Sequence, residues 1–196
     1  NSKKIVLSLA TISFLASCAN AALNSEIKTY DEVHKNVKTK SASVYSSQSG
    51  TSTSINTSQN DTHTISSTNN TLVIGSGGTI TISNGRQQAV NFQTGSSTST
   101  FKNQGTLIGG NNTASVQLGV DKNNGVTIET FENSGIIGNG TSKFGITVWG
   151  KDDSKSTINN FANSGTIHSN AGESIYLSNV DIKTFSNSGT IQSNSG

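Results

Sequence analysis

The chain has 196 residues, of which 12% are charged and 30% hydrophobic, with 20 glycines and no proline. Both fractions are low for a globular protein, where charged residues make up about 25% and apolar residues with glycine about 45–50%. The formal charge is +2, and the 11 acidic residues would balance the basic ones if Lys3 and Lys4 were removed with a signal peptide. This composition lacks the basic stripe that nucleic-acid binding needs, and it favours a repetitive β-structure with a thin core.

Residues 1–22 have the pattern of a secretory signal peptide. Lys3 and Lys4 precede an uncharged apolar run from Ile5 to Leu15. A membrane-spanning helix needs about 20 apolar residues, so this run is too short for a permanent span.

The end of the apolar run, Leu15-Ala16-Ser17-Cys18, resembles a bacterial lipobox. That resemblance implies a diacylglyceryl group on the Cys18 thiol, cleavage before Cys18, and an anchor in the outer membrane, because Ala19 rather than Asp follows. Cys18 is the only cysteine, which excludes an internal disulfide. Ordinary signal cleavage after Ala21 remains the alternative.

Two segments separate the signal from the repeats. Residues 23–40 are predicted to form a short amphipathic helix, because Ile27, Tyr30 and Val33 fall at helical spacing. This helix is either a solvated element near the membrane or a cap on the repeats. Residues 41–71 consist almost entirely of Ser, Thr, Asn and Gln, and we expect a flexible linker because so few apolar residues cannot offset the ordering of the backbone. A few residues before Thr71 could instead begin the first coil.

From residue 72 to 196 one motif recurs: Phe, any residue, Asn, any residue, Gly, any residue, and an aliphatic residue. Its copies are separated by 30, 30 and 24 residues, and four of the 7 phenylalanines are used in this way. The repeated positions are Phe101, Asn103 and Gly105; Phe131, Asn133 and Gly135; Phe161, Asn163 and Gly165; and Phe185, Asn187 and Gly189.

The repeat predicts an all-β fold, a right-handed parallel β-helix. Each repeat offers three short strands with alternating apolar residues, and coils stacked about 4.8 Å apart would pair every backbone group with the coils above and below. The phenylalanines would then stack inside, and the asparagines would form an amide ladder. We expect each repeat glycine to adopt a positive φ in its turn. A sandwich of antiparallel hairpins is the alternative fold. The residues by which the 30-residue spacing exceeds the 24-residue spacing are expected in loops such as 150–155.

The lipobox, the polar linker and the Phe-x-Asn-x-Gly repeats together resemble the passenger of a bacterial autotransporter. Within that class they are similar to the lipoprotein autotransporter adhesins of Campylobacter. The resemblance implies an exported β-helical passenger at the cell surface, held to the outer membrane by its lipid, which adheres to host cells. It also implies a C-terminal β-barrel translocator as partner. The chain ends inside a repeat at Gly196 without such a barrel, so we expect a fragment or truncated product.

The sequence predicts no catalytic residue, no metal site and no cofactor. Three histidines lack metal-ligand spacing, and the Gly-x-Ser-x-Gly motif of hydrolases is absent. A carbohydrate-processing β-helix enzyme would gather carboxylates on neighbouring coils, but the acidic residues do not recur in register. They are Asp121, Glu129, Glu132, Glu173 and Asp181.

Adhesion to host cells is therefore the function we expect, through a long polar face. Trp149, Tyr176 and the loop 150–155 are the candidate contact residues at the surface. The alternatives are a non-adhesive spacer or structural outer-membrane lipoprotein and, less favoured, the carbohydrate-processing enzyme.

Overall fold

A computed structural model describes residues 50–83, 85–120, 124–139 and 141–195, which contain 17 strands and no helix. The all-β prediction is confirmed for this part of the chain. The predicted signal peptide 1–22 with Cys18, the predicted helix 23–40 and the first residues of the predicted linker lie outside the described residues.

The strands belong to three parallel sheets, which we name sheets A, B and C. Sheet A consists of β1 (Ser52–Ile55), β4 (Asn70–Ile74), β7 (Ser97–Asn103), β10 (Thr127–Asn133), β13 (Ser156–Asn163) and β16 (Val180–Asn187). Sheet B consists of β2 (Ser58–Gln59), β5 (Thr79–Thr81), β8 (Thr106–Ile108), β11 (Ile136–Ile137), β14 (Thr166–Ser169) and β17 (Thr190–Ser193). Sheet C consists of β3 (His63–Ile65), β6 (Val90–Phe92), β9 (Ala114–Leu118), β12 (Phe144–Trp149) and β15 (Ile175–Ser178).

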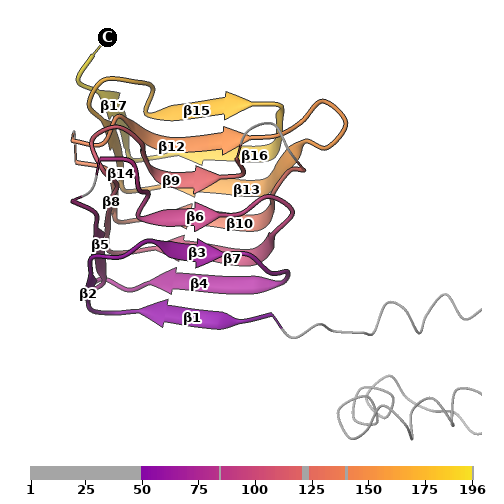
Figure 1. Ribbon diagram of the computed structural model, residues 1–196, viewed down its shortest axis with the longest axis horizontal. Helices are drawn as coiled ribbons and strands as arrows, with labels where there is room; N and C mark the ends of the chain where they lie inside the picture. Colours follow the sequence, from indigo (N-terminus) through magenta and orange to yellow (C-terminus); the bar gives the residue numbers. More distant parts are fainter. Residues whose placement is uncertain (1–49, 84, 121–123, 140, 196) are drawn as a thin grey trace, which may run out of the picture. The chain divides into compact units, whose positions relative to one another are not determined.

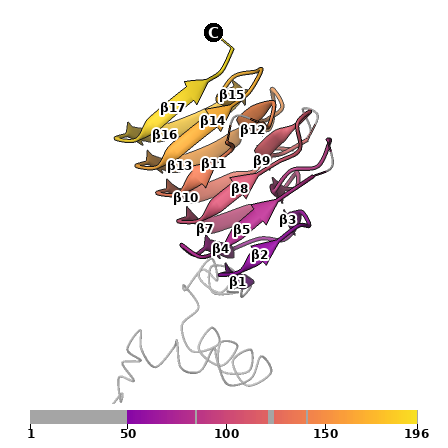
Figure 2. The ribbon, with the colours of Figure 1, turned by 90° about the vertical axis from the view of Figure 1, so that its left-hand side faces the viewer.

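Five successive turns of the chain contribute one strand to each sheet in the order A, B, C, and β16 and β17 then add one strand each to sheets A and B. Successive turns lie one above another, so that each turn adds its strands to the same edge of the sheets (Figures 1 and 2). The sandwich of antiparallel hairpins is wrong, because all strand pairs are parallel and the one antiparallel bridge of the described residues, Lys151 to Ser154, lies in a loop. The stacked parallel coils are compatible with a β-helix.

The first coil corrects the predicted linker 41–71. Strands β1, β2 and β3 lie within that segment and pair with β4, β5 and β6 of the next coil. Only Ile55 and Ile65 point into the core, at 3% and 5% exposure. This coil can be so polar because its backbone groups are paired with the next coil, so that hydrogen bonds supplement a small apolar contribution. Within the described residues the stack therefore includes Ser52, upstream of the predicted start at Leu72.

Aromatic and aliphatic side chains stack in columns inside the coils. Phe101, Phe131 and Phe161 occupy equivalent register positions, and their ring centroids are 4.7 Å apart in both steps. Phe185 continues the column at 5.0 Å. Alternate residues of β4 point inward, as its pattern of buried and partly exposed positions shows. The fully buried large residues are Phe92, Phe101, Phe131, Leu72, Ile74, Ile80, Leu107, Leu118, Ile128, Ile137, Ile146 and Ile158.

The repeat glycines are required for a different reason from the one predicted. Positive φ angles occur at Gly95, Gly119 and Gly138 among the described glycines, and at none of the repeat glycines. A Cβ atom at Gly135 would instead lie 2.1 Å from the carbonyl oxygen of Gly105 in the coil below. The same approach recurs at Gly105, Gly165 and Gly189. The turns of successive coils thus stack too closely for any side chain at this position.

Candidate functional site

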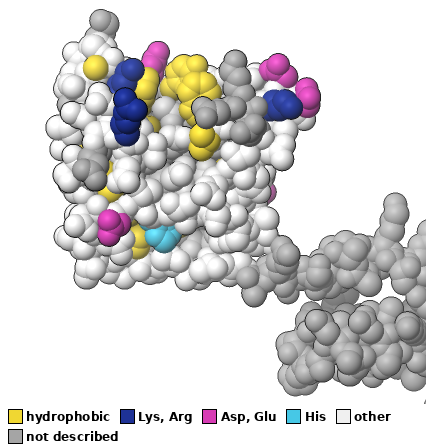
Figure 3. Space-filling view, viewed as in Figure 1, with side chains coloured by type: hydrophobic (Ala, Val, Ile, Leu, Met, Phe, Trp, Pro, Cys, Tyr) yellow, Lys and Arg dark blue, Asp and Glu magenta, His cyan; other side chains and the backbone are white. Residues whose placement is uncertain are grey.

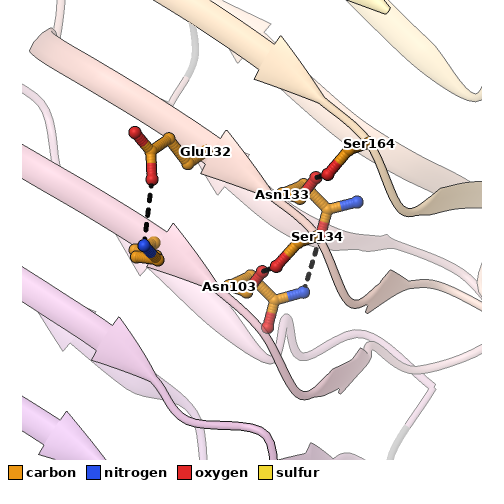
Figure 4. Close-up of polar contacts among 6 residues, drawn as sticks. Asn103, Glu132, Asn133, Ser134 and Ser164 are labelled. Carbon is orange, nitrogen blue, oxygen red and sulfur yellow. Dashed lines mark hydrogen bonds and ion pairs between the residues drawn. The ribbon is translucent and has the colours of Figure 1, made fainter. Parts of the chain in front are cut away.

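The Phe-x-Asn-x-Gly repeat forms a buried amide ladder at the turn between sheets A and B. Asn103 Nδ2 donates to Asn133 Oδ1 at 2.7 Å (Figure 4). Asn133 Nδ2 in turn donates to Asn163 Oδ1 at 2.7 Å. Asn163 continues the ladder to Asn187, also at 2.7 Å. Because the first three amides are buried, these asparagines act on the fold and are not available to a ligand. Phe185 on β16 is the exception among the repeat phenylalanines, at 52% exposure.

A groove of about 210 Å³ runs beside this ladder on the outer surface. Lys102 and Glu132 form an ion pair at 3.4 Å across neighbouring coils, and Ser134 donates a hydrogen bond to the carbonyl of Asn103 (Figure 4). The ion pair is solvent-exposed, so it adds less than about 1 kcal/mol to stability. The remaining lining is small and polar, and includes Gln104, Ser164, Ser186 and Ser188. This groove offers little that could fix a ligand.

Sheet C carries a more distinctive feature, three aromatic side chains that we name the aromatic row: Phe144, Tyr176 and Trp149. The ring centroid of Tyr176 lies 4.8 Å from that of Trp149 and 6.3 Å from that of Phe144. All three side chains are partly exposed. Figure 3 shows apolar side chains gathered over β12 and β15, with charged side chains near them.

Strand alternation brings Trp149 and Tyr176 to the outer face of sheet C, and Phe144 is left partly exposed at the first residue of β12. Ile146 and Val148 are fully buried in the core, so Thr147 and Trp149 point to the opposite side of β12. Tyr176 on β15 is the register partner of Thr147 and therefore lies on the same face, one coil further along. Trp149 and Tyr176, both predicted as surface contacts, are thus brought together, whereas Phe144 was not foreseen.

The predicted contact loop 150–155 is a tight hairpin at the end of β12. The backbone groups of Lys151 and Ser154 exchange two hydrogen bonds of 3.0 and 3.1 Å, which leaves Asp152 and Asp153 at the tip. Asn179 Nδ2 donates to Asp152 Oδ1 at 2.9 Å and so holds the hairpin beside the end of β15. This hairpin accounts for most of the difference between the 30- and 24-residue spacings, since β15 and β16 are joined through Asn179 alone.

The titratable groups are dispersed over the stack. Glu129 and Glu132 lie on β10, Asp181 lies on β16, Glu173 precedes β15, and Asp121 lies outside the described residues. Within the described ranges no three His, Cys, Asp or Glu side chains are grouped as metal ligands would be. Partial burial of His63 in the first coil lowers the pKa of its imidazole below 6.5.

The chain matches no protein-family model, no curated protein and no solved structure. In the described stretches there is no helix with the length and hydrophobicity that crossing a membrane requires.

Proposed function

We propose that the chain is the surface-exposed passenger part of an exported bacterial lipoprotein, of the autotransporter type, and that it acts in adhesion to host cells. The observation that carries this proposal is the aromatic row on the outer face of sheet C. Trp and Tyr are enriched in binding surfaces because they combine a large apolar area with a polar tip. Elsewhere the described outer faces are mainly uncharged and polar, as on the exposed side of β7.

A stack of coils suits this task physically. Each coil contacts only its neighbours, so the outer surface can be extended along one direction without enlarging the core. The stack is proposed to be right-handed, because nearly all connections between parallel strands of one sheet have that hand. Its side chains are held by a paired backbone, which limits the conformational entropy that binding would cost.

The proposed anchor is the lipid on Cys18. Several acyl chains on one residue provide stable attachment, since each buried CH₂ contributes about 0.8 kcal/mol. The short apolar run before Cys18 and the small residues of the lipobox support this assignment. The proposed location is therefore the outer membrane, with the coils exposed at the cell surface.

Attachment of the purified chain to epithelial monolayers tests the proposal. We expect saturable attachment that the double variant Trp149→Ala/Tyr176→Ala reduces by at least about tenfold, because interface aromatics carry a large share of binding energy. The matched control is Lys183→Ala, an exposed residue on β16 of sheet A. Equal attachment of the chain and an unrelated protein would support the spacer instead, and polysaccharide cleavage would support the enzyme.

A further inference from the structure

The polar tips of the aromatic row are free to meet a ligand. Among the described residues no hydrogen bond is made by the Trp149 indole N–H or the Tyr176 hydroxyl. Such groups normally find a partner when they lie inside a protein. The row therefore presents ring faces together with unused hydrogen-bonding groups on one rigid sheet.

The charges around the row are mixed in sign and mostly engaged. Lys143 lies over the Phe144 ring with its Nζ atom 5.1 Å from the ring centroid. At the other end, Lys151 faces Asp153 at 4.0 Å and Lys155 binds Asp181 at 3.1 Å. Glu173 adds a negative charge just before β15. Neither sign dominates, so the electrostatics favour an uncharged ligand over an anionic membrane or a highly charged polymer.

The hairpin 150–155 supplies a polar rim that is already in place. Ser156 Oγ donates to the Trp149 carbonyl at 2.6 Å and accepts from the Val126 N–H at 2.9 Å, which fixes the base of the hairpin. Asn179 holds Asp152 through one carboxylate oxygen, and the other oxygen remains an acceptor. A rim held in this way loses little entropy when it binds.

We propose that the aromatic row, with the hairpin as its rim, binds an uncharged oligosaccharide; this rests on the proposed adhesive function and names the receptor chemistry. A sugar ring has a face of C–H groups, which can pack on the aromatic rings. Its edge carries hydroxyl groups, which can form hydrogen bonds with the polar tips of the row and with the rim. Three aromatic side chains offer at most about 150–250 Å² each, which together is less than the about 800 Å² that a stable protein interface buries on each partner.

Trp149 makes the site directly observable, because it is the only tryptophan of the chain. The purified chain is first applied to an array of neutral and acidic oligosaccharides, and the neutral one that binds most strongly is then titrated against Trp149 fluorescence. We expect a saturable fluorescence change. Tyr176→Leu keeps an apolar side chain but removes the ring, and it should weaken binding by about tenfold. Tyr176→Phe keeps the ring and should stay within about threefold, and Lys183→Ala should match the wild type.

Equal binding by Tyr176→Leu and wild type would overturn the proposed site, and binding of acidic sugars alone would overturn the proposed ligand. If the chain attaches to cells but no oligosaccharide binds, the sugar inference fails while the adhesive function stands. If the chain attaches to no cells, the adhesive function itself fails. Circular dichroism verifies that each variant is folded. If Tyr176→Leu loses its β-sheet signal, Asp152→Ala in the exposed hairpin replaces it. Asp152→Ala should weaken sugar binding, and unchanged binding would contradict the proposed role of the hairpin as a rim.

Discussion

At Gly135 a single hydrogen atom in place of a side chain lets two turns of the chain stack. The space beside its Cα is occupied by the carbonyl of Gly105 and the backbone of Gln104. Backbone atoms cannot rotate away as the end of a flexible side chain can. The recurrence of glycine in this motif therefore reflects the distance between coils and not the conformation of one turn.

Gly135→Ala should lower the free energy of unfolding by at least about 3 kcal/mol, because the new methyl group overlaps fixed backbone. Gly95→Ala is the matched control, since its φ is +79° but no atom lies within 4 Å of the position that a Cβ would occupy. It should cost only about 1–2 kcal/mol, the strain of a left-handed residue. Thermal or urea unfolding followed by circular dichroism compares the two, and a larger loss in Gly95→Ala would refute this explanation.

Thr98 occupies a core position that its equivalents in later coils fill with isoleucine. It pairs in register with Ile128, it is 1% exposed, and its hydroxyl has no partner among the described residues. A buried polar group without a hydrogen bond lowers stability. Thr98→Val should therefore raise the free energy of unfolding by about 1 kcal/mol, whereas Thr98→Ser should lower it. Urea denaturation measures both, and a destabilised Thr98→Val would show that the hydroxyl is satisfied after all.

Among the elements, the turn between sheets A and B unites neighbouring coils through the amide ladder. Asn133 and Asn163 each accept from one neighbouring asparagine and donate to the next, so one residue serves two coil interfaces. This arrangement followed from the recurrence of the motif, because identical residues one coil apart meet their own copies when coils stack in register.

Asn133→Ala should lower the free energy of unfolding by about 2–4 kcal/mol, because it removes the ladder partners of both Asn103 and Asn163 in a buried turn. Its neighbour Ser134 is exposed and makes one long hydrogen bond of 3.4 Å. Ser134→Ala should change stability by less than about 0.5 kcal/mol. Equal effects of the two variants in chemical denaturation would argue against the ladder as a stabilising element.

The first coil contains a pH-sensitive residue, His63 on β3. Because burial lowers its pKa below 6.5, the unfolded chain binds more protons than the folded chain as the pH falls through 6.5. Stability should then decrease toward acid and be independent of this group at higher pH. Melting temperatures measured from about pH 8 to about pH 5 should show a shallower decline for His63→Gln. An unchanged pH profile in that variant would assign the decline to other groups.

The coils of the described residues are stacked in the order in which they occur along the chain. Contacts run between successive turns of the chain, so stability is approximately a sum over neighbouring coils. Thr127 and Thr157 are register partners 30 residues apart, and Ser97 is the partner of Thr127 in the preceding coil. Removal of one whole coil thus leaves its two neighbours with matching strands.

Deletion of residues 127–156 joins Val126 to Thr157 and should give a folded chain, in which Phe161 stacks on Phe101. The β-sheet signal per residue in circular dichroism should be close to that of the wild type. Deletion of residues 127–141, half a coil, should abolish cooperative unfolding because the sheets lose their register. The whole-coil deletion also removes Trp149, so we expect it to fold without attaching to cells. Failure of both deletions to fold would contradict the independence of the coils.

The motif copies in the sequence determined much of this architecture. The inward position of Phe131 and Asn133 could be predicted from the sequence. Residues that recur once per coil stack on their own copies when the coils stack. The polar first coil could not be foreseen, since its stability depends on hydrogen bonds to residues about 20 positions further along, as Ser52 shows in pairing with Thr71. The composition of a short segment does not indicate which distant strand it will pair with.

The aromatic row could not be derived from the sequence, because it depends on how the coils are folded together. Trp149 and Tyr176 do not belong to the repeat, and they meet because the hairpin 150–155 takes up residues that would otherwise shift the next coil. Phe144 completes the row through its place at the start of β12. The recurring residues can be read from the amino-acid order alone, whereas the neighbours of the unrepeated side chains depend on the folded lengths of the loops between strands. This is so because backbone pairing sets the register of the coils, and side chains outside the repeat occupy the outer positions that this register leaves to them.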